Sequence, residues 1–258
     1  MLTLELLWWV GWAWFAAWIA LPLVAVPVIG VVPGFVVWAV LAPWSALLGM
    51  ATLHRLLPKS EPGTFRLPGD EGSVRWAVKA WAPSLYLTLF QPLLFTSRFF
   101  QILALRAFGA HLAPGAWLTS RTIVREPHHV SVGLHSLIGE YAHLICSYQP
   151  RPGVLIVARI VIGDDSLVGG YSHLAPGVTI GSRCVIEYAV AIGARTVIGD
   201  DSRIGAGTTV YNAARIGRHV FIGKNCLIPS GAIIADGARI PDGTVWTSEV
   251  RRGLEAAS

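Results

Sequence analysis

Charged residues are scarce in this chain of 258 residues, and one long stretch has none. Asp, Glu, Lys and Arg make up 14% of the sequence, and none of them occurs between Glu5 and Arg55. Cysteine is also rare: three residues argue against a disulfide-stabilised scaffold and are consistent with a reducing compartment. No nucleic-acid-binding motif accompanies the net charge of +5. A membrane surface is therefore a better expected partner than a nucleic acid.

Apolar residues take the place of the missing charge, because 53% of the chain is hydrophobic. Residues 2–53 are dominated by Leu, Val, Ala and Trp, and Pro and Gly are concentrated at 27–34. Since about 20 apolar residues span a bilayer, this length predicts two passes. Seven of the eleven Trp precede Ser45, which is typical of anchoring at a membrane interface. We expect residues 1–55 to form a transmembrane helical hairpin.

Positive charge follows the apolar stretch, with Arg55, Lys59, Arg66, Arg75 and Lys79 close together. By the positive-inside rule this side of the membrane is the cytoplasm. Residues 56–75 are rich in Pro and Gly and are typical of an exposed cytoplasmic loop. The expected location is the bacterial inner (cytoplasmic) membrane, with the rest of the chain facing the cytoplasm.

A second apolar region covers residues 76–108, and each of its pieces is short for a full span. We interpret it as two interfacial or re-entrant helices whose basic residues Lys79, Arg98 and Arg106 face lipid headgroups. The alternative is a helical cap over the domain that follows.

From Val132 to Ile240 every sixth residue is apolar at eighteen of nineteen positions, with Pro150 as the exception. A second set, mostly small residues, lies four positions after each of them, and Gly commonly comes directly after the apolar residue. A period of six fits neither an α-helix nor a long strand, and it predicts a coiled β-solenoid. We expect an irregular entry over 109–131, a β-helix of roughly six coils over 132–245 and a tail over 246–258.

These hexads resemble the hexapeptide-repeat family, whose members fold as a left-handed parallel β-helix and are mostly acyltransferases that work as trimers. The segments PKSEPGTFRL and RAFGAHLAPGAWLTS before the hexads resemble the membrane and hexapeptide region at the carboxy terminus of poly-amino-acid-synthetase-type nonribosomal peptide synthetases. Residues 105–245 also resemble the soluble acetyltransferase branch. Both resemblances imply a thioester donor, carried by coenzyme A or by the phosphopantetheine of a carrier protein.

Acyltransferases of this family generally use a His as general base, and the resemblance places it near residues 147–149, where this chain has Ser-Tyr-Gln. His143 and His173 are the candidate replacements, since both are expected to project from the coils. Cys146, which closely follows His143, is a candidate acyl-accepting nucleophile. The alternatives are polar surface contacts for the two His and a small packed residue for the Cys.

Polar residues that interrupt the pattern are candidates for substrate binding, because rule violations gather at functional positions. Tyr148 and Gln149 lie in the break in register, and two further pairs replace the expected Gly and its neighbour in later hexads: Glu187 with Tyr188, and Tyr211 with Asn212. We expect these later residues to line a cleft between subunits together with His173. No metal is expected, because the chain lacks the His pattern of the γ-type carbonic anhydrases.

The sequence therefore favours a membrane-anchored homotrimeric acyltransferase. It would transfer an acyl or aminoacyl group from a thioester to an amine or hydroxyl in a biosynthetic pathway. The alternative is a non-catalytic trimeric scaffold that holds a carrier protein or an adenylating synthetase at the membrane.

Overall fold

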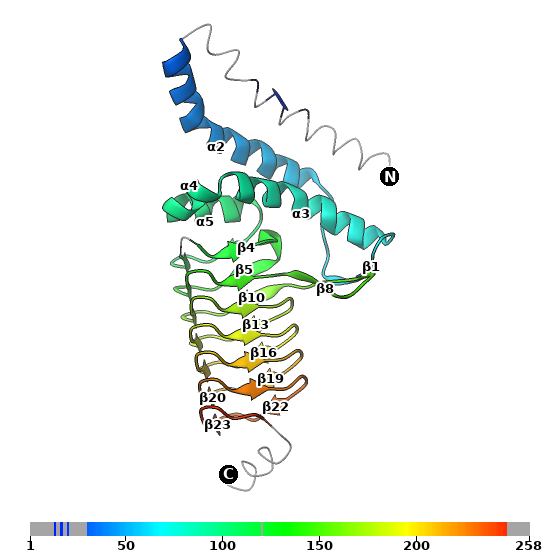
Figure 1. Cartoon of the computed structure of the whole chain (residues 1–258), viewed down its shortest axis with the longest axis vertical. Helices are drawn as coiled ribbons and strands as arrows, with labels where there is room; N and C mark the ends of the chain where they lie inside the picture. The colour runs from blue at the N-terminus through cyan, green and yellow to red at the C-terminus, as the bar shows by residue number, and fades with distance from the viewer. Residues whose placement is uncertain (1–12, 14–15, 18–19, 21–29, 120, 247–258) are drawn as a thin grey trace.

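Short parallel strands stack into a long prism, and helices lie across its amino-terminal end (Figure 1). The computed structural model describes residues 13, 16, 17, 20, 30–119 and 121–246. The prism is a left-handed parallel β-helix of about seven coils, which confirms the fold class predicted from the hexads.

Three parallel sheets form the sides of the β-helix, and each coil adds one strand to each sheet. In the regular coils a strand pairs with the strand three hexads later, as Val161 does with Thr179. The first side contains β2 (His111–Leu112), β5 (Val130–Val132), β10 (Ile160–Ile162), β13 (Thr179–Ile180), β16 (Val197–Ile198), β19 (Arg215–Ile216) and β22 (Ile233–Ile234). The second contains β3 (Trp117–Leu118), β6 (Leu137–Ile138), β11 (Leu167–Val168), β14 (Val185–Ile186), β17 (Arg203–Ile204), β20 (Phe221–Ile222) and β23 (Arg239–Ile240). The third contains β4 (Ile123–Val124), β7 (His143–Leu144), β12 (His173–Leu174), β15 (Ala191–Ile192), β18 (Thr209–Val210) and β21 (Leu227–Ile228).

The periodic apolar residues form the core, because the last residue of each regular strand points inward and is almost completely buried. The small residue four positions later fills the corner and bonds to the next coil. Ser166, for example, donates from Oγ to the carbonyl of Gly181 and accepts from the N–H of Cys184. Cys184 and Cys226 occupy the same position as buried free thiols, as the pattern predicts.

The β-helix begins at His111, one coil earlier than the predicted boundary at residue 132. Leu112 pairs with Val132, so this coil is longer by two positions than the regular coils, in which Val161 pairs with Thr179. The extra length belongs to the turn at η1 (Pro127–His129), which shifts the hexad phase. The predicted irregular entry over 109–131 is therefore a coil whose register is out of step with the later ones.

A hairpin leaves the β-helix after β7, at the point where the sequence shows Pro150 in an apolar position. It consists of β8 (Ser147–Arg151) and β9 (Val154–Val157), and it pairs antiparallel with β1 (Gly63–Arg66). The strands before and after the hairpin still pair in register, since Val132 pairs with Ile162, one coil of three hexads plus two further hexads along the chain. The hairpin therefore adds the length of two hexads, and the hexad pattern continues after it without a shift. The predicted exposed loop over 56–75 is thus partly wrong, because β1 is a strand of this three-stranded sheet.

In the described part of the chain, four helices precede the β-helix: α2 (Val31–Leu56), α3 (Glu71–Leu89), α4 (Gln91–Thr96) and α5 (Arg98–Ala107). Phe100 and Ala104 of α5 pack with Ala46 and Met50 of α2, whereas Leu105 joins the core of the β-helix. The helices therefore cover the end of the prism (Figure 1).

The predicted transmembrane hairpin over 1–55 is not found among the described residues. No helix that the structure describes has the length and apolar character needed to cross a membrane. Residues 1–12 and 21–29, on which much of that prediction falls, lie outside the described residues.

The basic residues of the helices contact the protein itself, which corrects the prediction that they face lipid headgroups. Lys79 is buried and donates from Nζ to the carbonyls of His54 and Leu57 at the end of α2, where a cation is favoured. The guanidinium of Arg98 lies over the ring of Trp117, 3.0 Å from its centroid. Arg106 donates to the carbonyl of Leu112 over 2.8 Å.

Candidate functional site

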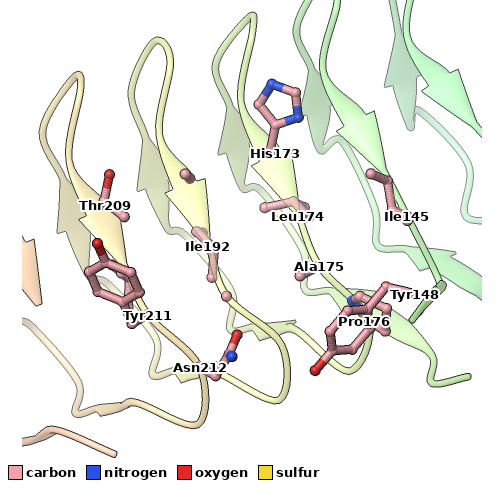
Figure 2. Close-up of a pocket in the computed structure, with 13 residues that line it drawn as sticks. Ile145, Tyr148, His173, Leu174, Ala175, Pro176, Ile192, Thr209, Tyr211 and Asn212 are labelled. Atoms are coloured by element: carbon pink, nitrogen blue, oxygen red, sulfur yellow. The ribbon is translucent and has the colours of Figure 1, made fainter. Parts of the chain in front are cut away.

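A groove of about 250 Å³ crosses three coils on the third side of the β-helix (Figure 2). His173, Ala191 and Thr209 lie on its floor, since each is the outward-facing first residue of its strand. Parallel pairing places them in one column, with His173 opposite Ala191 and Ala191 opposite Thr209. The groove therefore follows the stacking direction of the coils.

The corner of the β-helix forms one edge of the groove. Tyr211 stands where the hexad normally has Gly, so an aromatic ring projects from a position that is otherwise bare. Asn212 accepts a hydrogen bond from the N–H of Ala194 through Oδ1 over 2.8 Å. Its Nδ2 has no partner among the described residues, which leaves an amide donor at the edge of the groove.

The hairpin contributes to one end of the groove, where Tyr148 of β8 and Pro176 both line it (Figure 2). Ile145, the residue that leaves the coil before the hairpin, also lines this end. The break in the hexads thus supplies a wall. Of the predicted substrate-binding residues, the structure brings Tyr148, Tyr211 and Asn212 together in one groove.

His143 and His173 face each other on neighbouring strands, in register, with ring centroids 4.6 Å apart. His173 is exposed and lines the groove, whereas His143 is half-buried beside it. Burial, and then the nearby imidazole of His173, lower the pKa of His143. His143 is therefore neutral at pH 7, and an exposed imidazole with a neutral neighbour borders the groove.

Cys146 is not placed as a nucleophile. Its side chain is fully buried, and Sγ contacts the carbonyl of His129 at 3.7 Å on the inner side of the coil. Burial and the charge of Glu126 raise the pKa of the thiol well above its usual range. Cys146 is therefore a small packed residue, which is the alternative to a nucleophile given above. Gln149 is exposed on β8 and does not line the groove.

Glu187 and Tyr188 lie on a different corner, after β14, so they do not join His173 within one chain. Oε1 of Glu187 accepts from Nε of Arg203 over 2.9 Å, and Oε2 accepts from the N–H of Ala206 over 3.0 Å. Tyr188 continues a column of aromatic rings that includes Tyr171, with ring centroids 5.3 Å apart. Both residues serve contacts between coils.

Sequence reasoning missed Ala191, Thr209 and Gly193 of the groove. The missing signal was the coil period: His173, Ala191 and Thr209 each lie one full coil apart and therefore fall on the same side. Polar character alone singles out unusual residues without saying which of three corners they occupy. Within the described residues, no three His, Cys, Asp or Glu side chains gather in a way that could hold a metal ion.

Two family models match parts of the β-helix. The model described as bacterial transferase hexapeptide (six repeats) matches residues 159–194, and the hexapeptide repeat of succinyl-transferase matches residues 213–247. Residues 159–194 and 213–247 of the β-helix are therefore similar to the hexapeptide repeats that these two models describe. No curated protein sequence matches the chain.

Solved structures with similar coils include perosamine N-acetyltransferase from Caulobacter crescentus, with CoA and GDP-perosamine, at 17% identity and a TM-score of 0.32. That match covers 56% of this chain and 59% of the other. AntD, an N-acyltransferase from Bacillus cereus, with dTDP and 3-hydroxybutyryl-CoA, matches at 14% identity and a TM-score of 0.47, over 60% of this chain and 93% of its own. The acetyltransferase domain of PglB from Neisseria gonorrhoeae matches at 19% identity and a TM-score of 0.34, over 54% and 62%. The chain spans less than two thirds of the first and third of these proteins. The resemblance to peptide synthetases stays a prediction.

Proposed function

We propose that this chain is an acyltransferase that moves an acyl or aminoacyl group from a thioester to an amine or a hydroxyl. The observation that carries the proposal is the pair of His143 and His173 at the border of the groove. The matches to bacterial transferase hexapeptide repeats support the same class of reaction. The donor would be an acyl-coenzyme A or an acylated phosphopantetheine on a carrier protein, with its pantetheine in the groove.

In this reaction His173 is the general base. As the acceptor nitrogen or oxygen attacks the thioester carbonyl, its proton passes to the ring of His173 and the new C–N or C–O bond forms. The C–S bond then breaks, and the thiolate that leaves takes the proton. Because His143 is neutral, it does not repel the positive charge that His173 acquires.

The test replaces His173 and His143 by Ala, separately and together, in the full-length protein. The assay measures thiol release from acyl-coenzyme A and from acyl-pantetheine with a panel of amines and sugar hydroxyls. We expect the His173→Ala variant to lose about 10²–10⁴-fold in kcat/KM. The matched control is His219→Ala, since His219 is an exposed residue beside Asp201, outside the groove. Full activity in the double variant would exclude a His-dependent reaction.

A non-catalytic scaffold is the second candidate, and the hairpin is the observation that favours it. The family base is expected near 147–149, but β8 carries Ser147, Tyr148 and Gln149 there. β8 is also an edge strand of its sheet, where a partner chain can add by main-chain hydrogen bonds. In that case the His variants keep the host pathway running, whereas Gln149→Pro stops it.

We also propose that the protein is a homotrimer. Val161, Val197 and Ile233 project from β10, β16 and β22 in one column of the first side, alternating with Thr179 and Arg215, and all three are exposed in the single chain. A flat face with exposed apolar residues of this kind is typical of a subunit interface. Light scattering should give three times the chain mass of 27.8 kDa, and Val197→Lys should yield monomers.

We further propose that the helices rest on the cytoplasmic face of a bacterial inner membrane. Leu41, Leu48 and Leu56 lie about two helical turns apart on α2 and are exposed, so one face of this helix is apolar. Exposed apolar residues on a helix support contact with a lipid interface. In flotation with anionic vesicles, Leu48→Glu should reduce binding, and Leu167→Glu on the β-helix should not.

A further inference from the structure

The sheet of β1, β9 and β8 projects beside the β-helix and has one outer face (Figure 1). Residues that pair across neighbouring strands lie on the same face of a sheet. Two paired rows cross the outer face: Thr64, Ile156 and Tyr148, and then Arg66, Val154 and Arg151. The opposite face points inward, since Leu155 is fully buried. The outer face therefore carries an arginine on each of its two edge strands.

The two arginines have no partner for their charge. Arg66 and Arg151 are exposed, and neither guanidinium makes a hydrogen bond or an ion pair with a described residue. The three strands contain no Asp or Glu. A carboxylate oxygen of Asp70 accepts from the backbone N–H of Arg66 instead. Because unpaired guanidinium groups attract carboxylates and phosphates, this face suits an acidic partner.

The outer face continues into the groove. Tyr148 lies in its first row and also lines the groove, as Pro176 does (Figure 2). Arg195, at the corner after β15, donates from Nη2 to Oγ1 of Thr64 over 3.4 Å. The backbone N–H of Arg195 donates to the carbonyl of Pro176 over 2.9 Å. Three exposed guanidinium groups therefore lie outside the end of the groove that Tyr148 lines.

The length of a phosphopantetheine arm matches this arrangement. About thirteen bonds separate its sulfur from its phosphorus, and at about 1.2 Å for each bond an extended arm spans about 16 Å. Pro176 is three residues after His173, so the two Cα atoms are at most about 11 Å apart. An arm with its thioester at His173 is thus long enough to pass Pro176. Whatever carries its phosphate then lies over the outer face of the sheet.

The spacing of the second row indicates what this carrier is. Arg66 and Arg151 are two strand spacings apart, about 10 Å, with the half-buried Val154 between them. Acidic residues at positions i and i+7 of an α-helix are separated by about 10.5 Å along its axis. A helix with two such carboxylates and an apolar residue between them fits the row. The diphosphate of coenzyme A is much shorter than the row, because its two phosphorus atoms share one oxygen.

We infer that the outer face of this sheet docks an acidic, helical carrier protein, whose phosphopantetheine arm enters the groove past Tyr148. The inference rests on the proposed acyl transfer, and it names a carrier protein rather than free coenzyme A as the donor. Arg195 contacts the phosphate of the arm, which both donors share. Arg66 and Arg151 pair with carboxylates that only the carrier protein has.

The experiment measures binding and needs no turnover. The acyl and peptidyl carrier proteins of the host, in their holo forms, and coenzyme A are each titrated into the full-length protein by calorimetry. We expect a holo-carrier to bind, and the double variant Arg66→Glu, Arg151→Glu to raise its Kd about tenfold, because two attractive pairs become like-charge contacts. The Kd of coenzyme A should stay nearly unchanged. Carrier binding should also weaken between about 0.1 M and about 1 M salt.

Arg218→Glu is the matched control. Arg218 is exposed at the corner after β19, and its side chain makes no ion pair with a described residue. The double variant Arg66→Lys, Arg151→Lys keeps both charges and should bind the carrier nearly as the parent does. Melting curves identify a variant that fails to fold. If the Glu double variant does, the double variant Arg66→Gln, Arg151→Gln takes its place beside the Lys pair.

The outcomes separate this inference from the proposed function. It is overturned if the Glu double variant weakens coenzyme A as much as the carrier, if Arg218→Glu has the same effect, or if no carrier protein binds the parent. It is also overturned if the double variant loses anionic vesicles in flotation and keeps the carrier. If a holo-carrier binds through the two arginines while no acyl group is transferred, the docking surface stands and the proposed function fails. If His173-dependent transfer from acyl-coenzyme A occurs and no carrier binds, the reverse holds.

Discussion

The regular coils and the junction with the helices differ in how they pair their buried polar groups. In the coils one rule repeats: Ser202, for example, donates to the carbonyl of Gly217 and accepts from the N–H of Val220. The buried side-chain atoms without a partner in the described structure all belong to the junction, on Trp76, Gln101, His128 and His129. Because the coils repeat, the hydrogen-bond partners of a buried polar side chain in one coil recur in the next. Contacts between a helix and a coil do not repeat in this way. The junction is therefore where less stable and more specialised contacts gather.

The largest predicted difference between the two regions is their response to acid. Burial lowers the pKa of His54 to about 4, of His128 to about 2 and of His129 to about 4. All three bind protons more weakly in the folded state than when unfolded, where the pKa is about 6.5. The protein therefore keeps its full stability above about pH 6.5 and loses stability as the pH falls, by about 2 kcal/mol for each His at pH 5.

Hydrogen exchange at pH 7 and pH 5 checks this difference. We expect the amides of α2, α3 and η1 to lose protection at pH 5 while those of β13 to β20 keep theirs. His128→Phe should restore part of the protection, and His219→Gln, at an exposed turn, should change nothing. Equal loss in both regions would show that the junction is not the acid-sensitive part.

The next effect concerns the core of the coils. Ile186 is completely buried in the ladder of inward residues, so Ile186→Ala should destabilise the protein by about 2–5 kcal/mol. Ile233 is 58% exposed on the outer side of β22, and Ile233→Ala should cost less than about 0.5 kcal/mol in the monomer. Urea unfolding of the two variants, both made in the Val197→Lys background that is expected to be monomeric, measures the contrast. Similar costs for both would mean that the ladder is not a continuous core.

The same contrast explains how much of the fold followed from the sequence. The hexads from Ile162 to Ile240 predict the coils, because each coil repeats the one before it. The first coil was not predicted, because η1 lengthens it and shifts the hexad phase. The hairpin β8–β9 was not predicted, because the length it adds is a multiple of six and leaves the hexad phase unchanged. Contacts between helices and coils, such as the cation–π contact of Arg98 with Trp117, follow no period and were missed.

The candidate site was predicted in part for a similar reason. His173, Tyr148, Tyr211 and Asn212 were singled out as unusual, and they meet in the groove. Glu187 was singled out by the same criterion but lies on another corner. The hexad period tells which residues face outward, and only the coil period tells which of them share a side. Packing against a separate hairpin cannot be inferred from either period.

A smaller effect distinguishes two ion pairs of the β-helix. The hydrogen bond from Arg203 lowers the pKa of Glu187, so its contribution is present above the unfolded pKa, about 4.3, and is lost as the pH falls below that value. At pH 7 Glu187→Gln should cost about 0.5–1 kcal/mol in urea unfolding. The difference from the parent protein should shrink as the pH falls below about 4.3. Glu140→Gln is the control, because Glu140 and Arg121 are 3.9 Å apart and the change should be nearly neutral.

The smallest predicted effect has the opposite sign and concerns the turns of the regular coils. Ala213 is exposed and adopts φ 59°, a left-handed conformation that costs a residue with a Cβ about 1–2 kcal/mol. Gly avoids this cost but loses about 0.5–1 kcal/mol of entropy on folding. Ala213→Gly should therefore stabilise the protein by about 0.5 kcal/mol in urea unfolding. Ala235, an exposed corner residue without positive φ, is the matched control, and Ala235→Gly should be destabilising. If both substitutions destabilise the protein, the left-handed conformation at Ala213 costs less free energy than the entropy that Gly loses on folding.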